Sequence, residues 1–94
     1  MNVYYTYLFD YYGDLFTSKQ KEYFIDYYFN NLTLQEIADN NNVSRNAVHK
    51  NLKDIVQKLD YYEEKLKLYS NKKKIEELIK DIDIDIKKKI EELI

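Results

Sequence analysis

The stretch from Thr33 to Leu52 reads Thr-Leu-Gln-Glu-Ile-Ala-Asp-Asn-Asn-Asn-Val-Ser-Arg-Asn-Ala-Val-His-Lys-Asn-Leu. Thr33 and Glu36 have the spacing of a capping box, in which each side chain accepts a hydrogen bond from a backbone amide of the first helical turn. Ser44 is a good N-cap for a second helix. The stretch therefore predicts two short helices joined by a tight turn, which is a helix-turn-helix.

The turn between these two predicted helices falls on Asn40, Asn41 and Asn42. Asn adopts the left-handed conformation that a sharp turn requires more readily than most residues other than Gly. The small side chain of Ala38 lets the second helix cross closely, and Val43 is expected to fill the corner. An ordinary antiparallel helix pair is the alternative, because small bundles contain many of them.

The second helix of this motif has an apolar side and a basic side. Its inward residues are expected to be Ala47, Val48, Leu52 and Ile55. The side chains left outside are Arg45, Asn46, His49, Lys50 and Lys53. A basic, amide-rich helix face of this kind enters a DNA groove in helix-turn-helix proteins. These five residues are the candidate nucleic-acid-binding residues.

Charge is unevenly distributed along the 94 residues, whose formal net charge is −2. Residues 1–44 carry two Lys against six acids, residues 45–58 carry four basic groups against Asp54, and residues 59–94 carry nine Lys against ten acids. The concentrated positive segment thus coincides with the predicted recognition helix, as phosphate contact requires. The net charge of this segment, four basic groups less one acid, is small for DNA binding. Either the protein is therefore a homodimer or DNA is not its main partner.

The composition also excludes several classes of protein. The chain has no Cys and a single His, and it shows no Gly-rich phosphate loop and no nucleophile–base arrangement, so we expect no enzyme activity, no cofactor and no metal. Asp81, Asp83 and Asp85 imitate a calcium loop, but Ile86 stands where that loop needs Gly. No apolar run approaches the roughly 20 residues of a membrane span. A cytoplasmic protein without membrane contact is expected.

Helical periodicity organises the rest of the chain. Residues 2–13 form one predicted helix, and a second begins after a cap at Thr17 or Ser18 and ends near Asn30. From Val48 a heptad-like apolar series continues to Tyr69, so the recognition helix is expected to run unbroken from 45 to about 69, with a break at Ser70-Asn71. So long a helix needs more cover than the preceding 44 residues offer, from the last helix or from a second copy of the chain.

The C-terminal segment contains the octapeptide Lys-Lys-Lys-Ile-Glu-Glu-Leu-Ile twice, at 72–79 and at 87–94. Its apolar residues from Ile75 to Leu93 keep near-heptad spacing, which predicts a helix that packs along one stripe. The predicted helix that carries this stripe is either a dimerisation arm or a helix that frays at its end. The chain is thus expected to comprise a helix-turn-helix domain, residues 1–69, and a C-terminal helical arm, residues 70–94.

Several segments together resemble the YlxM-type helix-turn-helix proteins of low-G+C Gram-positive bacteria and their wall-less relatives. The matching segments are Tyr7 to Tyr12, Leu15 to Lys21, Tyr27-Tyr28, Leu34 to Ala38, Val43 to Val48 and Tyr62 to Leu66. The resemblance covers residues 7 to about 68. It implies an all-α protein, a small helical bundle with a helix-turn-helix like that of the fourth region of sigma factors, and often a dimer.

The resemblance also implies a link to protein targeting, because members are suspected of taking part in the signal recognition particle pathway. Three hypotheses follow. The chain is a dimeric regulator that binds duplex DNA through Arg45, Asn46, His49, Lys50 and Lys53. Alternatively, it is an accessory factor that contacts the RNA or the GTPase of the signal recognition particle. The third hypothesis is a helical interaction module without nucleic-acid contact.

Overall fold

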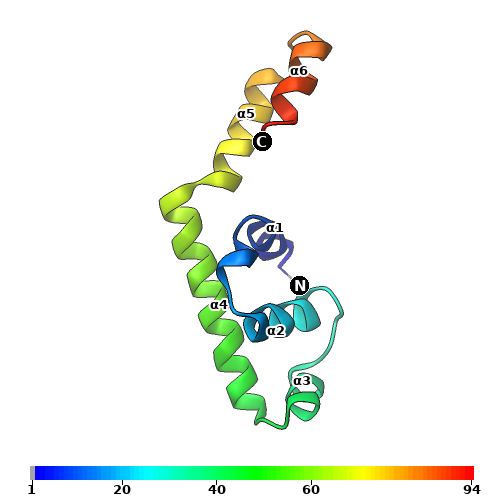
Figure 1. The fold of residues 1–94 in the computed structure, drawn as a ribbon, viewed down its shortest axis with the longest axis vertical. Coiled ribbons are helices and arrows are strands. Elements are labelled where there is room, and N and C mark those ends of the chain that lie inside the picture. Colours follow the sequence, from blue (N-terminus) through cyan, green and yellow to red (C-terminus); the bar gives the residue numbers. More distant parts are fainter. Residues whose placement is uncertain (1) are drawn as a thin grey trace.

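A computed structural model describes residues 2–94, and every regular element in them is helical. The elements are α1 (Val3–Tyr12), a 3-10 turn η1 (Gly13–Leu15), α2 (Ser18–Tyr28), α3 (Leu34–Asn41), α4 (Arg45–Leu66), α5 (Leu68–Ile79) and α6 (Ile84–Glu91). The long helix α4 runs down one side, α1, α2 and α3 lie along it, and α5 with α6 form an arm beyond its end (Figure 1). The all-α prediction is confirmed.

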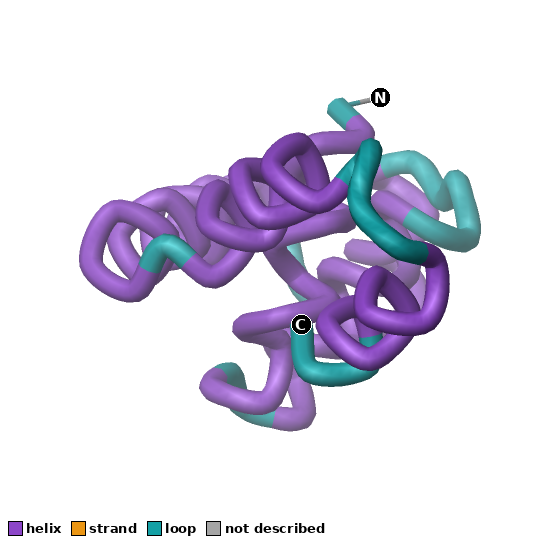
Figure 2. The backbone as a smooth tube through the Cα atoms, turned by 90° about the horizontal axis from the view of Figure 1, so that it is seen from above, coloured by secondary structure: helices purple, strands orange, loops and turns teal. Residues whose placement is uncertain are grey.

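Local capping sets where the helices begin. Thr33 and Glu36 form the predicted capping box, with both amide-to-oxygen distances at 3.0 Å, and the Ser44 hydroxyl accepts from the Ala47 amide at 3.0 Å. A second capping box joins Thr17 and Gln20 at the start of α2. These caps satisfy amides that a helix start leaves unpaired. Figure 2 views the same helices from above, joined by short loops.

One hydrophobic core joins α1, α2, α3 and α4, together with Phe16, which follows η1. Its rings stack closely, with the Phe24 centroid 4.2 Å from that of Phe9 and 4.3 Å from that of Tyr28. The buried side chains are Leu8, Tyr12, Phe16, Tyr23, Phe24, Ile37, Ala38, Val48, Leu52, Ile55 and Leu59. Burial of Val48, Leu52 and Ile55 agrees with the predicted inward side of the recognition helix, whereas Ala47, also predicted to lie inward, is only half-buried.

The distal half of α4 packs against α1 and also contacts α5, but Tyr61 and Leu66 remain 56% and 52% exposed. Further cover by a second copy of the chain therefore stays a prediction. The Tyr12 ring lies 5.9 Å from that of Tyr62, and the Tyr5 hydroxyl donates to Asp60 at 3.0 Å. Tyrosine rings cover large areas for one residue each, which allows the short α1 to shield this half of the long helix.

The recognition helix ends at Leu66, and not near Tyr69 as the heptad pattern predicted. Lys67 adopts a left-handed conformation, with φ 56°, and the predicted break at Ser70-Asn71 lies inside α5. Glu63, which is only 8% exposed, accepts hydrogen bonds from the Tyr69 amide at 3.1 Å and the Ser70 amide at 2.9 Å. These bonds satisfy the start of a new helix and so favour the break.

The C-terminal segment is two helices, so the predicted single helix packing along one stripe was wrong. The chain turns between Ile79 and Ile84, where the Asp83 carboxylate caps α6 by accepting from the Asp85 amide at 3.0 Å and the Ile86 amide at 3.3 Å. Leu78 and Leu93, the matching leucines of the octapeptide repeat, are 79% and 85% exposed. An Asp within the apolar series favours a helix start over helix continuation.

Candidate nucleic-acid interface

The turn between α3 and α4 is held by backbone and side-chain hydrogen bonds. Asn42 is left-handed, with φ 54°, and its amide donates back to Ala38 and Asp39. The Val43 amide also donates to the Ala38 carbonyl, at 3.1 Å. The predicted left-handed asparagine is therefore confirmed at Asn42, and the turn fixes the angle at which α4 leaves α3.

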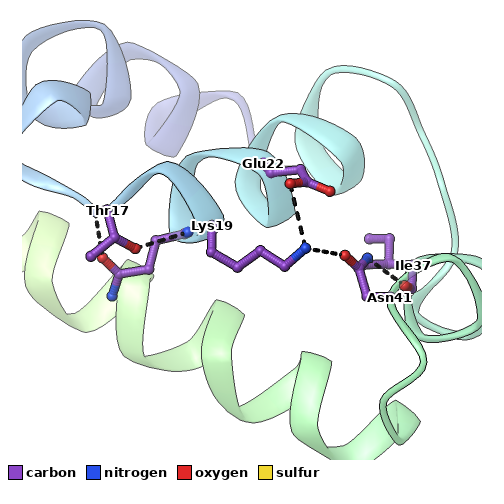
Figure 3. A network of polar contacts seen from close by, with 6 residues as sticks. Thr17, Lys19, Glu22, Ile37 and Asn41 are labelled. Carbon is purple, nitrogen blue, oxygen red and sulfur yellow. Dashed lines mark hydrogen bonds and ion pairs between the residues drawn. The ribbon is translucent and has the colours of Figure 1, made fainter.

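Asn41, which was predicted to lie in the turn, is the last residue of α3 and makes polar side-chain contacts. Its side-chain amide donates to the Ile37 carbonyl at 2.7 Å, and its oxygen accepts from the ammonium of Lys19 on α2 (Figure 3). Lys19 also pairs with Glu22 at 3.5 Å and lies over the Tyr23 ring. The turn is thus tied to α2 by a network that the sequence did not reveal.

Val43 does not fill the corner, which corrects the sequence-based prediction. Its side chain is 39% exposed, whereas Ile37, Ala38 and Val48 are fully buried there. Val43 follows the left-handed Asn42 and lies outside both helices, so its backbone holds the turn while its side chain stays at the rim. The close crossing of α3 and α4 therefore depends on Ala38.

All five predicted contact residues are exposed on α4. None of them takes part in an ion pair or a side-chain hydrogen bond within residues 2–94. The buried residues Val48, Leu52, Ile55 and Leu59 hold the opposite side of the helix in the core. The arrangement leaves the basic side chains of α4 directed at solvent, where they can meet an anionic partner.

The five residues are divided between two parts of this exposed side. Arg45 borders a hollow with Tyr27, Asn31 and Thr33, between α4 and the loop that precedes α3. His49 and Lys53 border a neighbouring hollow with Tyr28 and Leu34. Asn46 and Lys50 border neither hollow.

Tyr27, Tyr28 and the loop residues Asn31 and Thr33 were not predicted as part of the interface. Both tyrosines are half-buried. Their position beside Arg45 and His49 depends on how α2 packs against α4, and no local sequence signal reports that packing.

Within residues 2–94 there is no group of three His, Cys, Asp or Glu side chains placed to hold a metal ion. The same residues contain no helix with the length and apolar character of a membrane span.

Comparison with known proteins identifies the family. The whole chain, residues 1–94, matches the UPF0122 family, described as "Putative helix-turn-helix protein, YlxM / p13 like". The match includes the C-terminal arm, which the resemblance found in the sequence did not reach.

Individual relatives agree with this match. A UPF0122 protein of Malacoplasma penetrans is 49% identical over 77 residues, covering 79% of this chain and 72% of the relative. A UPF0122 protein of Fusobacterium nucleatum is 47% identical over 81 residues, covering 86% of this chain and 79% of the relative. A UPF0122 protein of Bacillus pumilus is 49% identical over 74 residues, covering 79% of this chain and 67% of the relative. The chain therefore belongs to the UPF0122 family of YlxM/p13-like helix-turn-helix proteins.

Proposed function

We propose that this protein binds nucleic acid through the exposed side of α4, as a regulatory helix-turn-helix protein with duplex DNA as its first candidate partner. The observation that carries the proposal is the unpaired basic side of α4, held outward by a capped turn and four buried apolar residues. In this proposal Arg45 and Asn46, in the first turn, contact base edges, while Lys50 and Lys53 contact phosphates and His49 lies between them.

The small net charge of the basic segment favours a homodimer. Residues 45–58 carry four basic groups against one acid, which gives one copy few phosphate contacts. Two copies would place two recognition helices in successive major grooves and double the charge that meets the duplex. The homodimer is therefore part of the proposal.

The experiment is a fluorescence anisotropy titration of a labelled mixed-sequence duplex with the wild-type protein and with Lys50→Glu/Lys53→Glu. Each phosphate contact adds about 0.9 to the slope of log affinity against log salt. Wild-type affinity should fall on the order of tenfold or more between about 50 and 200 mM salt, and the double variant should lose binding or show a slope lower by about 2.

Lys88→Glu/Lys89→Glu is the matched control, because it makes the same charge change on exposed residues of α6. It should keep most of the wild-type affinity. Absence of salt-sensitive duplex binding by the wild type at about 50 mM salt, or equal losses in both double variants, would reject DNA binding through α4.

A role in the signal recognition particle pathway is the alternative, and it rests on the resemblance noted in the sequence. The same three proteins can be titrated against the particle's RNA and added to its GTPase. RNA binding that Lys50→Glu/Lys53→Glu abolishes, or altered GTP turnover with the wild type, would favour an accessory factor. A protein that affects neither and binds no duplex would be a helical interaction module.

A further inference from the structure

The elbow between α4 and α5 joins two helices at a single residue. Lys67 is left-handed, with φ 56°, a conformation that is unfavourable for a residue with a Cβ. The segment from Arg45 to Ile79 contains no Gly and no Pro, and its apolar spacing continues through Leu66 and Tyr69. The local sequence therefore favours one continuous helix, so contacts from elsewhere in the fold must stabilise the bend.

Tyr12 and Glu63 supply those contacts. The Glu63 carboxylate accepts from the amides of Tyr69 and Ser70, and the Tyr12 hydroxyl accepts from the Leu68 amide at 3.1 Å while it donates to Glu63 at 2.7 Å. Both side chains are buried, with 1% of Tyr12 and 8% of Glu63 exposed. Two side chains thus satisfy the first three amides of α5.

A continuous helix would satisfy the same three amides in another way. In a straight helix each amide donates to the carbonyl four residues earlier, so Leu68, Tyr69 and Ser70 would pair with residues 64–66. The bent and straight forms therefore offer these three amides different acceptors. The side chains of Tyr12 and Glu63 are the acceptors in the bent form, so they stabilise it over the straight form. Leu66 and Leu68 flank the elbow and remain 52% and 45% exposed, so the apolar contact that favours the bend comes from Tyr69, which packs against α1.

We propose that the Lys67 elbow is a two-state hinge, in which the buried Tyr12–Glu63 pair holds the bent form and its loss lets α4 and α5 join into one helix. Straightening carries the α5–α6 arm away from α1. It also withdraws Tyr69 from its place against Tyr4 and Tyr7, whose ring centroids lie 5.6 and 5.7 Å from its own. The hinge controls the direction of the arm relative to the helix-turn-helix, whatever the partner of α4.

The test measures the distance between α1 and the arm by pulsed electron–electron resonance. The chain has no Cys, so spin labels attach only at the two cysteines introduced at Asp10→Cys and Lys88→Cys, both exposed positions. The labelled protein is diluted with an excess of unlabelled protein, so that distances within one chain are measured even in a dimer, and the wild-type background should then give one distance. Glu63→Ala should add a second population at longer distance, and Tyr12→Phe should do so to a smaller extent because Glu63 remains.

Lys67 provides a matched pair of second-site variants. Both Lys67→Gly and Lys67→Ala remove the charged chain beyond Cβ, but only Gly also lacks the Cβ that makes the left-handed conformation unfavourable. In the Glu63→Ala background, Lys67→Gly should restore the shorter distance and Lys67→Ala should leave the longer one.

Two results would overturn the hinge. The first is a single, unchanged distance in Glu63→Ala while circular dichroism shows cooperative unfolding. The second is a longer population that Lys67→Gly fails to reduce, which would indicate an arm that has detached or frayed. If Glu63→Ala does not fold, the same two criteria apply to Tyr12→Phe, which keeps the ring in the core.

Discussion

Tyr12 lies where α1, α4 and α5 meet, and its hydroxyl takes part in two hydrogen bonds there. Burial and the hydrogen bond to Glu63 raise its pKa from 10.0 to about 12, although the Leu68 amide partly offsets this rise. The neutral phenol is favoured mainly because burial penalises the phenolate, and also because ionisation would remove the proton that Tyr12 donates to Glu63.

The raised pKa of Tyr12 predicts a loss of stability at alkaline pH. In the unfolded chain the phenol ionises near pH 10, whereas in the folded protein it ionises near 12. Between these values the unfolded state binds fewer protons, so the free energy of unfolding falls as pH rises. The full contribution is present below pH 10 and is lost as pH rises through about 12.

Urea unfolding measures the free energy of unfolding of the wild type and of Tyr12→Phe at several pH values between 9 and 12, and so tests the predicted loss of stability. Burial also raises the pKa of Tyr4, Tyr5 and Tyr28, so both proteins should lose stability with pH. The wild type should lose more, and its advantage over the variant should shrink. An advantage that stays constant up to pH 12 would contradict the assigned role of Tyr12.

At the scale of elements, the α3–α4 turn depends on the left-handed Asn42. We predict that Asn42→Ala lowers the free energy of unfolding by about 1 kcal/mol, because Ala tolerates this conformation poorly. Asn42→Gly should be at least as stable as the wild type, since Gly adopts it without a Cβ clash. Thermal and urea unfolding measure the relative stabilities of the wild type and the two variants. Equal stability of the Ala and Gly variants would contradict the prediction.

Sequence patterns anticipated the elements whose causes are local. The capping box at Thr33 and Glu36 and the cap at Ser44 involve residues three apart, so the starts of α3 and α4 could be predicted. The exposed side of α4 followed from helical spacing for the same reason. The elbow at Lys67 could not be predicted, because Tyr12, which helps to stabilise it, lies 51 residues from its partner Glu63.

The missed parts of the candidate interface have the same explanation. The contact of Lys19 with Asn41 crosses from α2 to the end of α3, and the hollows beside Arg45 and His49 need α2 and α4 to be packed together. Such contacts are tertiary, and periodicity in a single sequence does not encode them.

At the scale of the whole molecule, the protein is elongated, 54 Å along its longest axis, with the α5–α6 arm at the end opposite to the helix-turn-helix (Figure 1). The arm buries little: Ile79 is its one buried residue among those described, and α6 has none. Helices of 12 and 8 residues are too short to be stable alone in water, so the exposed apolar residues of the arm favour association.

The proposed homodimer therefore predicts a concentration-dependent mass. Sedimentation velocity of the wild type over a wide concentration range should show dimers, and Leu78→Asp/Leu93→Asp should shift them toward monomers, because the two most exposed leucines of the arm would then carry charge. Leu15→Asp is the control, since Leu15 is 57% exposed in η1, away from the arm. A wild type that stays monomeric at every concentration would remove the dimer from the proposal. If Leu15→Asp weakens the dimer as much as Leu78→Asp/Leu93→Asp does, the dimer interface does not lie in the arm.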